Sequence, residues 1–250
     1  MRITVLGKHA PFPPAGGACS GYLLEHEGTR VLIECGSGVL SRLQVVMSLC
    51  DLTDVVLSHL HGDHTSDLMV LRYAADADLR HERRPGGIRV HAPPDPPEEF
   101  ERLAYKEVMI PHAVHDGDEL TIGDMRFRFT AVDHPFPCLA MTVSAGGETF
   151  AYSGDTAACA RLVEAARGAD LFLCEASLME DENLSGYRGH LSAAQAGRVA
   201  AEAGVGALML THLWPFHDPR RLAAEAAREF RGRVCIPVEG ATYPVRGPGT

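Results

Sequence analysis

The stretch Val55-Val56-Leu57-Ser58-His59-Leu60-His61-Gly62-Asp63-His64 is the most informative part of the chain. It opens with continuous apolar residues, as expected of a strand that is buried on both faces of a sheet. Three imidazoles and a carboxylate follow within six residues, ahead of a helix that we expect over residues 66–79. These groups would repel one another and lose hydration unless a cation replaced their protons. The stretch therefore predicts a metal site beyond the end of a buried strand.

A second segment, Leu208-Met209-Leu210-Thr211-His212-Leu213, repeats this order of apolar strand, hydroxyl residue, histidine and leucine. Asp155 follows the β-type run 149–153 in the same way, and His134 follows the run 125–132. Open α/β sheets bind ligands in the loops beyond the carboxyl ends of their strands. We therefore expect four strand ends to contribute ligands to one site.

Short β-type runs alternate with helical runs along the chain, which favours sheets covered by helices. The β-type runs lie at 3–6, 21–26, 30–34, 55–58, 88–92, 125–132, 139–145, 149–153, 171–175, 207–211 and 233–238. Helical periodicity is clearest at 39–49, 66–79, 97–103, 157–167, 192–203 and 220–230. Because no repeat, linker or low-complexity tract divides the sequence, we expect a single domain over residues 1–250.

The composition is that of a soluble globular protein, with 46% hydrophobic residues and no apolar run long enough to span a membrane. The N-terminus resembles a first strand rather than a signal peptide. The seven cysteines are scattered without a Cys-x-x-Cys pair, which favours the reducing cytoplasm. A formal charge of −10 disfavours long nucleic acid as a partner, whereas bound metal could still attract a small anionic substrate.

The chain resembles the metallo-β-lactamase superfamily through four motifs that occur in the family's order. They are the His-x-His-x-Asp-His run that begins at His59, Val132-Asp133-His134-Pro135, Tyr152-Ser153-Gly154-Asp155-Thr156 and Leu210-Thr211-His212-Leu213. The resemblance implies an α/β fold, a four-layer αββα metallo-β-lactamase sandwich with metals at one edge between two similar halves. It also implies a homodimer.

The family pattern implies two divalent metal ions and assigns seven residues to them. His59, His61 and His134 would hold one ion, Asp63, His64 and His212 would hold the other, and Asp155 would bridge both. Zinc is the expected metal, with manganese and iron as alternatives because ligand type alone selects weakly. The chain departs from the pattern at Glu34, where the family has an aspartate that supports the ligands. A glutamate can still accept a hydrogen bond from a metal-binding histidine.

The segment Gly189-His190-Leu191-Ser192-Ala193-Ala194-Gln195-Ala196 is similar to a motif of ribonuclease Z and its small phosphodiesterase relatives. In these enzymes an extra histidine reaches the scissile phosphate, so His190 is predicted to protonate or stabilise the leaving oxygen. Asp63 is predicted to orient the nucleophile, a hydroxide bound to the metals. The alternative for His190 is that it merely precedes a helix capped by Ser192.

Ribonuclease Z carries a basic arm that grips tRNA between the positions that match Asp155 and His190. Here that interval is 35 residues, and we expect a helix, a strand and an acidic loop at 179–183 to fill it. We therefore predict a phosphodiesterase that cleaves a small diester such as a 3′,5′-cyclic nucleotide. The alternatives are a ribonuclease Z-like RNA endonuclease, a lactone or ester hydrolase on the same site, and an inactive metal-binding or RNA-binding module.

Overall fold

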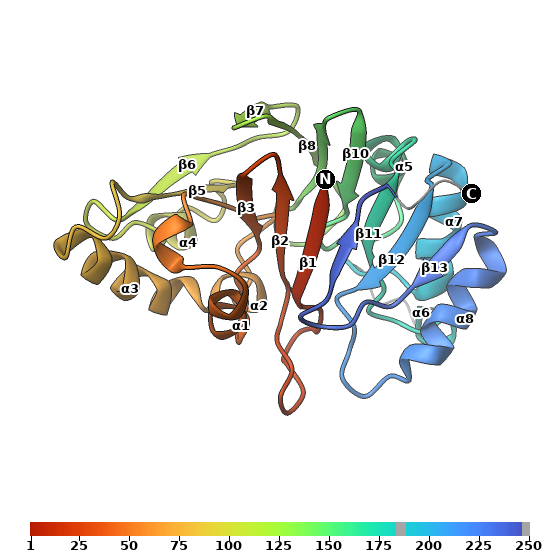
Figure 1. The fold of residues 1–250 in the computed structure, drawn as a ribbon. Coiled ribbons are helices and arrows are strands. Elements are labelled where there is room, and N and C mark those ends of the chain that lie inside the picture. Colours follow the sequence, from red (N-terminus) through yellow and green to blue (C-terminus); the bar gives the residue numbers. More distant parts are fainter. Residues whose placement is uncertain (184–188, 247–250) are drawn as a thin grey trace.

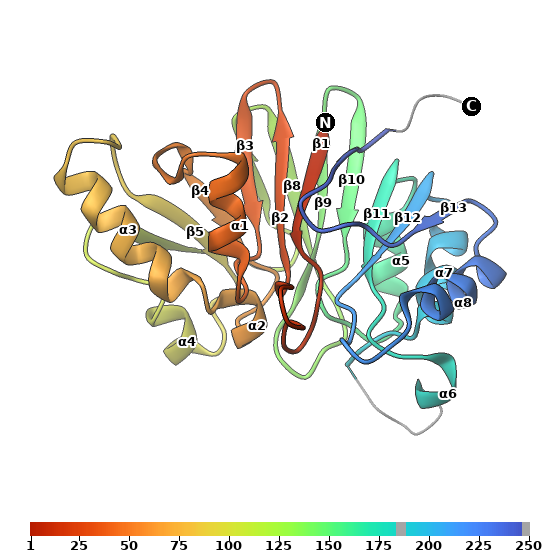
Figure 2. The same cartoon turned by 60° about the horizontal axis from the view of Figure 1, so that its bottom comes forward.

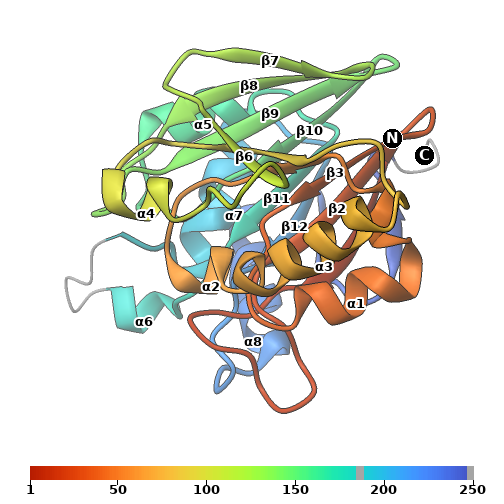
Figure 3. The same ribbon diagram turned by 90° about the vertical axis from the view of Figure 1, so that its left-hand side faces the viewer.

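Two seven-stranded sheets pack face to face in the computed structural model, which describes residues 1–183 and 189–246 (Figures 1 and 3). The first sheet, in the order β14-β1-β2-β3-β4-β5-β6, contains β1 (Arg2–Gly7), β2 (Gly21–His26), β3 (Thr29–Ile33), β4 (Asp54–Val56), β5 (Ile88–Ala92), β6 (Met109–Ala113) and β14 (Thr242–Pro244). The second, in the order β13-β12-β11-β10-β9-β8-β7, contains β7 (Glu119–Ile122), β8 (Met125–Ala131), β9 (Leu139–Ala145), β10 (Glu148–Tyr152), β11 (Leu171–Glu175), β12 (Ala207–Thr211) and β13 (Arg233–Cys235).

Helices cover the outer face of each sheet and complete four layers (Figure 2). The helices in the described part of the chain are α1 (Val39–Val46), α2 (Gly62–Thr65), α3 (Leu68–Arg80), α4 (Pro97–Glu101), α5 (Ala160–Ala166), α6 (Glu180–Asn183), α7 (Ala193–Ala203) and α8 (Pro219–Glu229), with a 3-10 turn η1 at Leu49–Asp51. Helices α1 and α3 pack on the first sheet, and α5, α7 and α8 pack on the second. This is the αββα arrangement that the sequence resemblance implies. None of these helices is both long and apolar enough to cross a membrane.

The two sheets have the same internal plan. From β14 to β3 the neighbouring strands are antiparallel, and from β3 to β6 they are parallel. From β7 to β10 they are antiparallel, and from β10 to β13 they are parallel. Strands within each parallel set end at the same edge of their sheet, where loops can bring polar side chains together. Figure 2 shows α2 and α6 at this end of the molecule.

The interior between the sheets is built from the alternation of apolar and polar residues along the strands. In β8, Phe127 and Phe129 are fully buried while Arg126 and Arg128 point to solvent. Burying one such aromatic side chain contributes about 1.5–3 kcal/mol to stability. Tyr22 of β2 and Tyr152 of β10 meet across the two sheets, with ring centroids 5.4 Å apart. This packing gives the loops beyond the strands a rigid base.

Some predicted elements differ from the structure. The run 39–49 is not one helix, because Met47 is extended (φ −154°) and separates α1 from η1. Strands β6, β7 and β14 were not predicted, since they are short and mostly lack a buried apolar alternation. The prediction of an acidic loop at 179–183 is wrong, because residues Glu180–Asn183 form α6. A side-chain oxygen of Glu182 accepts a hydrogen bond from the Met179 backbone N–H and so supports the start of this helix (2.8 Å).

Candidate metal centre

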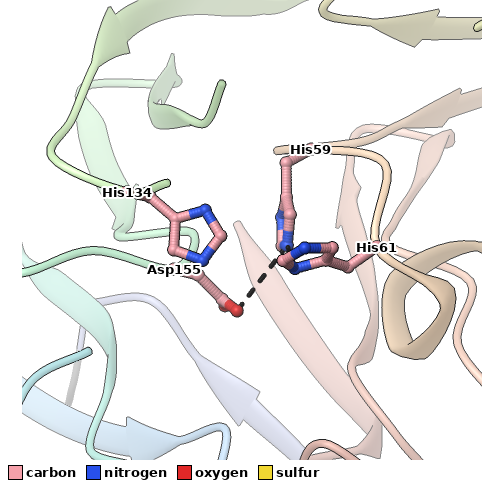
Figure 4. A group of neighbouring side chains, drawn as sticks. All are labelled: His59, His61, His134 and Asp155. Atoms are coloured by element: carbon pink, nitrogen blue, oxygen red, sulfur yellow. Dashed lines mark hydrogen bonds and ion pairs between the residues drawn. The ribbon is translucent and has the colours of Figure 1, made fainter. Parts of the chain in front are cut away.

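The seven predicted ligands converge where the strand ends of the two sheets meet. Four of them lie in loops that follow strands: His59 after β4, His134 after β8, Asp155 after β10 and His212 after β12. The other three, His61, Asp63 and His64, lie at the start of α2 or within it. Figure 4 shows His59, His61, His134 and Asp155 pointing toward a common centre. The sequence prediction that separate strand ends supply one site therefore agrees with the placement of these side chains.

The side chains form two neighbouring groups whose ligand atoms lie within 4.8 Å of one another in each group. The first contains His59, His61, His134 and Asp155, and the second contains Asp63, His64 and His212. Nε2 of His59 lies 3.0 Å from Nδ1 of His61, and Nε2 of His64 lies 3.2 Å from Nε2 of His212. Imidazole nitrogens at this spacing suit tetrahedral coordination of a borderline-soft divalent ion.

Asp155 faces both groups from a buried position, with 1% of its surface exposed. Its Oδ2 lies 3.1 Å from Nε2 of His212 and 3.6 Å from Nε2 of His59, the contact drawn in Figure 4. Its Oδ1 lies 3.4 Å from Nε2 of His64 and has no hydrogen-bond partner among the described residues. A buried carboxylate oxygen without a partner is stabilised if a cation binds beside it. The donor set thus fits the binding of divalent metal, and the Asp155 carboxylate faces both groups.

Hydrogen bonds to the second ring nitrogen orient several of the histidines. Nδ1 of His59 pairs with Oγ of Ser58 at 3.0 Å, and Nδ1 of His134 pairs with the carbonyl oxygen of Phe136 at 2.9 Å. Because a neutral imidazole carries one proton, donation from Nδ1 of His134 leaves its Nε2 free to bind metal. The loop residues beside the ligands therefore fix the ring orientation.

Glu34 occupies the supporting position where the sequence departs from its family pattern. Its Oε2 lies 3.4 Å from Nδ1 of His64, and its Oε1 accepts a hydrogen bond from the backbone N–H of Ser58 at 3.0 Å. The residue has a left-handed backbone (φ 60°), which turns its longer side chain back toward the ligands. The glutamate is thus close enough to His64 to support it electrostatically.

Opposite charges stabilise one another inside this buried site. Burial alone would raise the pKa of Asp155, but His212, His64 and His59 hold it well below its ordinary value. Burial lowers the pKa of His212, yet the neighbouring carboxylates of Asp155, Asp63 and Glu175 together outweigh this effect and raise it to about 10. For His59 burial dominates, and its pKa falls well below the ordinary value. A divalent cation can replace the protons that such a cluster otherwise needs.

Two important residues were missed from the sequence, namely Glu175 at the end of β11 and Ser177 just after it. Oε1 of Glu175 accepts hydrogen bonds from the Thr156 backbone N–H at 2.8 Å and from Nδ1 of His190 at 3.0 Å. The Ser177 hydroxyl donates to Oε2 of Glu175 at 2.7 Å and lies 2.8 Å from Nδ1 of His212. The available signal was an acidic residue that ends a buried apolar strand, the same pattern that identified the ligand loops.

His190, which the sequence motif predicts to act on the leaving oxygen, lies beside the predicted ligands His212 and Asp155. Its ring stacks on His212 with centroids 5.3 Å apart and an interplanar angle of 25°. Burial lowers its pKa, but the Glu175 carboxylate outweighs this and gives a net increase. Ser192 does cap α7, in a reciprocal capping box with Gln195. The cap therefore does not involve the His190 side chain, whose ligand atom also lies within 4.8 Å of those of Asp155 and His212.

Comparison with known proteins identifies the family of this chain. The family model described as the beta-lactamase superfamily domain matches residues 29–213. The chain belongs to the β-lactamase superfamily. Within that superfamily, YhfI of Bacillus subtilis, described as a probable metallo-hydrolase, is 33% identical over 243 residues, covering 97% of this chain and 99% of YhfI. The crystal structure of YhfI superposes on this structure with a TM-score of 0.93, and the match covers 97% of this chain and 98% of the YhfI chain.

Ribonuclease Z proteins are also among the relatives of this chain. Ribonuclease Z of Thermobifida fusca is 29% identical over 298 aligned residues, covering 94% of this chain and 92% of that protein. The structure of the human tRNase Z short form covers 98% of this chain with a TM-score of 0.74 and 20% identity, which shows a shared fold. The chain is therefore a metallo-hydrolase of the β-lactamase superfamily, and ribonuclease Z proteins are among its relatives.

Proposed function

We propose that this metallo-hydrolase cleaves a small phosphodiester, with a 3′,5′-cyclic nucleotide as the first candidate. The observation that carries the proposal is the position of His190, which stacks on His212 and is held by Glu175 at 3.0 Å. A protonated imidazole beside the ligand groups can donate to a departing alkoxide.

The proposed ligand assignment follows the two groups of side chains. His59, His61 and His134 would hold one ion and Asp63, His64 and His212 the other, with Asp155 between them. Zinc is the proposed metal because imidazole nitrogen dominates the set. When bound, two divalent ions would supply an activated water as nucleophile and would neutralise charge on the phosphate.

The protein's own residues then orient the reactants. Oδ2 of Asp63 lies 3.3 Å from Nε2 of His212, and 11% of the Asp63 side chain is exposed, so this carboxylate can accept a hydrogen bond from the attacking water. His190 would hold a proton at the leaving oxygen. Glu175 would keep the His190 ring in place through Nδ1 and so direct Nε2 toward the substrate. No covalent intermediate is required.

The expected substrate is small because the chain carries a formal charge of −10, which opposes binding of a long polyanion. Between Asp155 and His190, the described residues form only α5, β11 and the acidic α6, and residues 184–188 lie outside the described range. The ribonuclease Z relatives favour a second candidate, endonucleolytic cleavage of RNA. We also propose a cytoplasmic enzyme, which the seven unpaired cysteines support.

The test compares diester substrates with good and poor leaving groups in the wild type and His190→Ala. Turnover of cyclic AMP should fall roughly 10²–10⁴-fold in the variant, the usual range for a positioned acid. The loss should be much smaller for a nitrophenyl diester, since nitrophenolate needs little protonation. Metal content should stay unchanged. His115→Ala is the matched control, because this exposed histidine lies outside the ligand groups.

Other outcomes would contradict the proposal. Equal losses for both leaving groups would make His190 a phosphate-binding residue, and loss of metal would make it a ligand. Efficient cleavage of precursor tRNA at one position, without turnover of small diesters, would establish the RNA endonuclease instead. Turnover of a homoserine lactone but of no diester would establish an ester hydrolase.

A further inference from the structure

A cavity of about 450 Å³ opens beside the metal centre and has no role in the mechanism described above. It lies between α2, the start of α3 and α4. Its lining includes Leu60, Met69, Leu103, Phe136, Glu99 and Arg102. Sites for small organic ligands typically have volumes of about 300–1,000 Å³, so a group of nucleoside size fits this space.

Phe136 connects the cavity to the metal ligands. Its ring packs on the ring of His61 with centroids 4.3 Å apart and an interplanar angle of 37°. Its backbone carbonyl oxygen lies 2.9 Å from Nδ1 of His134, so the same residue also orients a second ligand. His61 itself lines the cavity. A substrate whose phosphate lies at the metal centre can therefore extend its non-reacting part past Phe136.

The cavity has an apolar interior and a charged rim. Leu60 and Leu103 are 4% and 3% exposed, and with Phe136 they provide an apolar surface. At the rim, Nη1 of Arg102 donates to both carboxylate oxygens of Glu99 at 3.0 Å. The two side chains are partly exposed, so the pair contributes little to stability and can exchange partners at small cost.

We infer that this cavity binds the nucleobase of the substrate, an inference that rests on the proposed phosphodiesterase function. A base offers a planar face for Phe136 and an edge that carries both N–H donors and N or O acceptors. Glu99 can only accept hydrogen bonds and Arg102 can only donate them, so together they match such an edge. An alkyl chain would fill the apolar walls without engaging this pair. A second sugar would leave the apolar walls poorly covered.

The test measures KM for cyclic AMP, cyclic GMP and cyclic CMP, and for a 3′,5′-cyclic ribose phosphate in which hydrogen replaces the base. All share the scissile bond and the leaving group. The wild type should have a much lower KM for at least one nucleotide than for the base-free compound. Phe136→Ala should raise that KM roughly 5-fold to 100-fold, the usual effect of removing an aromatic stacking partner. The effect on the base-free compound should be at least fivefold smaller.

Glu99→Gln and Arg102→Ala test the rim without altering a residue that contacts a proposed metal ligand. Each should raise the KM for the preferred nucleotide several-fold more than that for the base-free compound, and should change the order of preference among bases. Calorimetry with the matching nucleoside monophosphate should show a parallel weakening. Glu101→Gln is the control, because Glu101 lies on the same helix but does not line the cavity.

The outcomes separate this inference from the proposed function. Equal KM values for nucleotides and the base-free compound in the wild type would overturn the base site while leaving phosphodiesterase activity intact. Equal losses on both kinds of substrate in all three cavity variants would do the same. If the wild type cleaves none of these diesters, the proposed function itself fails. If Phe136→Ala disturbs the metal ligands, Glu99→Gln and Arg102→Ala decide the question.

Discussion

Replacing Glu175 with glutamine is predicted to weaken metal binding at the group of Asp63, His64 and His212, although Glu175 is not a predicted ligand. Glu175 is fully buried. Its Oε1 accepts hydrogen bonds from the Thr156 N–H at 2.8 Å and from His190 Nδ1 at 3.0 Å, and its Oε2 accepts from the Ser177 hydroxyl at 2.7 Å. A glutamine has only one side-chain oxygen, so it cannot accept all of these bonds.

The direction of the effect follows from the donors around the side chain. Two N–H groups point at Oε1, so the glutamine oxygen should occupy that side and its amide should face Ser177. The Ser177 hydroxyl must then donate to Nδ1 of His212 at 2.8 Å or to the His212 carbonyl oxygen at 3.1 Å. The substitution itself removes the negative charge of Glu175 near the His212 ring. Donation to Nδ1 would also place the ring proton on Nε2, the atom that faces Asp63 and Asp155.

Loss of such a supporting partner typically reduces metal affinity about 10–100-fold, which corresponds to roughly 1.4–2.7 kcal/mol. Competition with a zinc-binding chelator measures the affinity directly, and a thermal melt checks that the fold is intact. Glu119→Gln, an exposed substitution on β7, is the control. Ser177→Ala should cause a smaller loss, because it removes the orienting hydroxyl without removing the charge. Wild-type zinc affinity in Glu175→Gln would refute this account of how His212 is oriented.

Three further predictions concern the ligand bridge, the backbone and acid stability. Asp155→Ala should lose at least one metal ion and nearly all turnover, as measured by elemental analysis and activity after dialysis, because the carboxylate faces both ligand groups. Gly36→Ala should lower the free energy of unfolding by about 1–3 kcal/mol or more in urea titration, since its Cβ would lie 1.9 Å from a backbone oxygen of α2. For Asp54, burial raises the pKa, but His91 and Arg89 outweigh it and lower the pKa to about 2. The stabilisation of the folded state by ionised Asp54 is therefore complete above about pH 4 and is lost as the pH falls through about 2. Asp54→Asn should lower the free energy of unfolding at pH 7 by about 1–2 kcal/mol, a value that allows for solvent screening of the exposed Arg89.

The sequence was informative about the site because its signals are local. A histidine or aspartate just after an apolar strand can be recognised from a few neighbouring residues, as at His59 and His212. Strands of this kind pair in parallel in the structure, so their carboxyl ends lie at one edge. The motif around His190 was also local, and the structure places this side chain against His212.

The features that were missed depend on contacts between distant residues. Ser177 matters because it lies between Glu175 and His212, and this arrangement exists only after β11 and β12 pair. The cavity beside Phe136 requires α4 to lie near α2, which no periodicity in the sequence indicates. Strand β14 was not predicted either, because it is short and forms through pairing with the distant β1.

The backbone at two positions links the fold to the proposed chemistry. Glu34 after β3 and His212 after β12 both have positive φ, at 60° and 57°, although neither is glycine. This conformation costs about 1 kcal/mol or more at such residues, so surrounding contacts must hold it in place. Oε1 of Glu34 accepts from the Ser58 N–H, and the Ser177 hydroxyl lies 3.1 Å from the His212 carbonyl oxygen. The side chains of both residues lie near the centre that contains Asp155, so the same backbone conformation in both halves helps to assemble the proposed metal site.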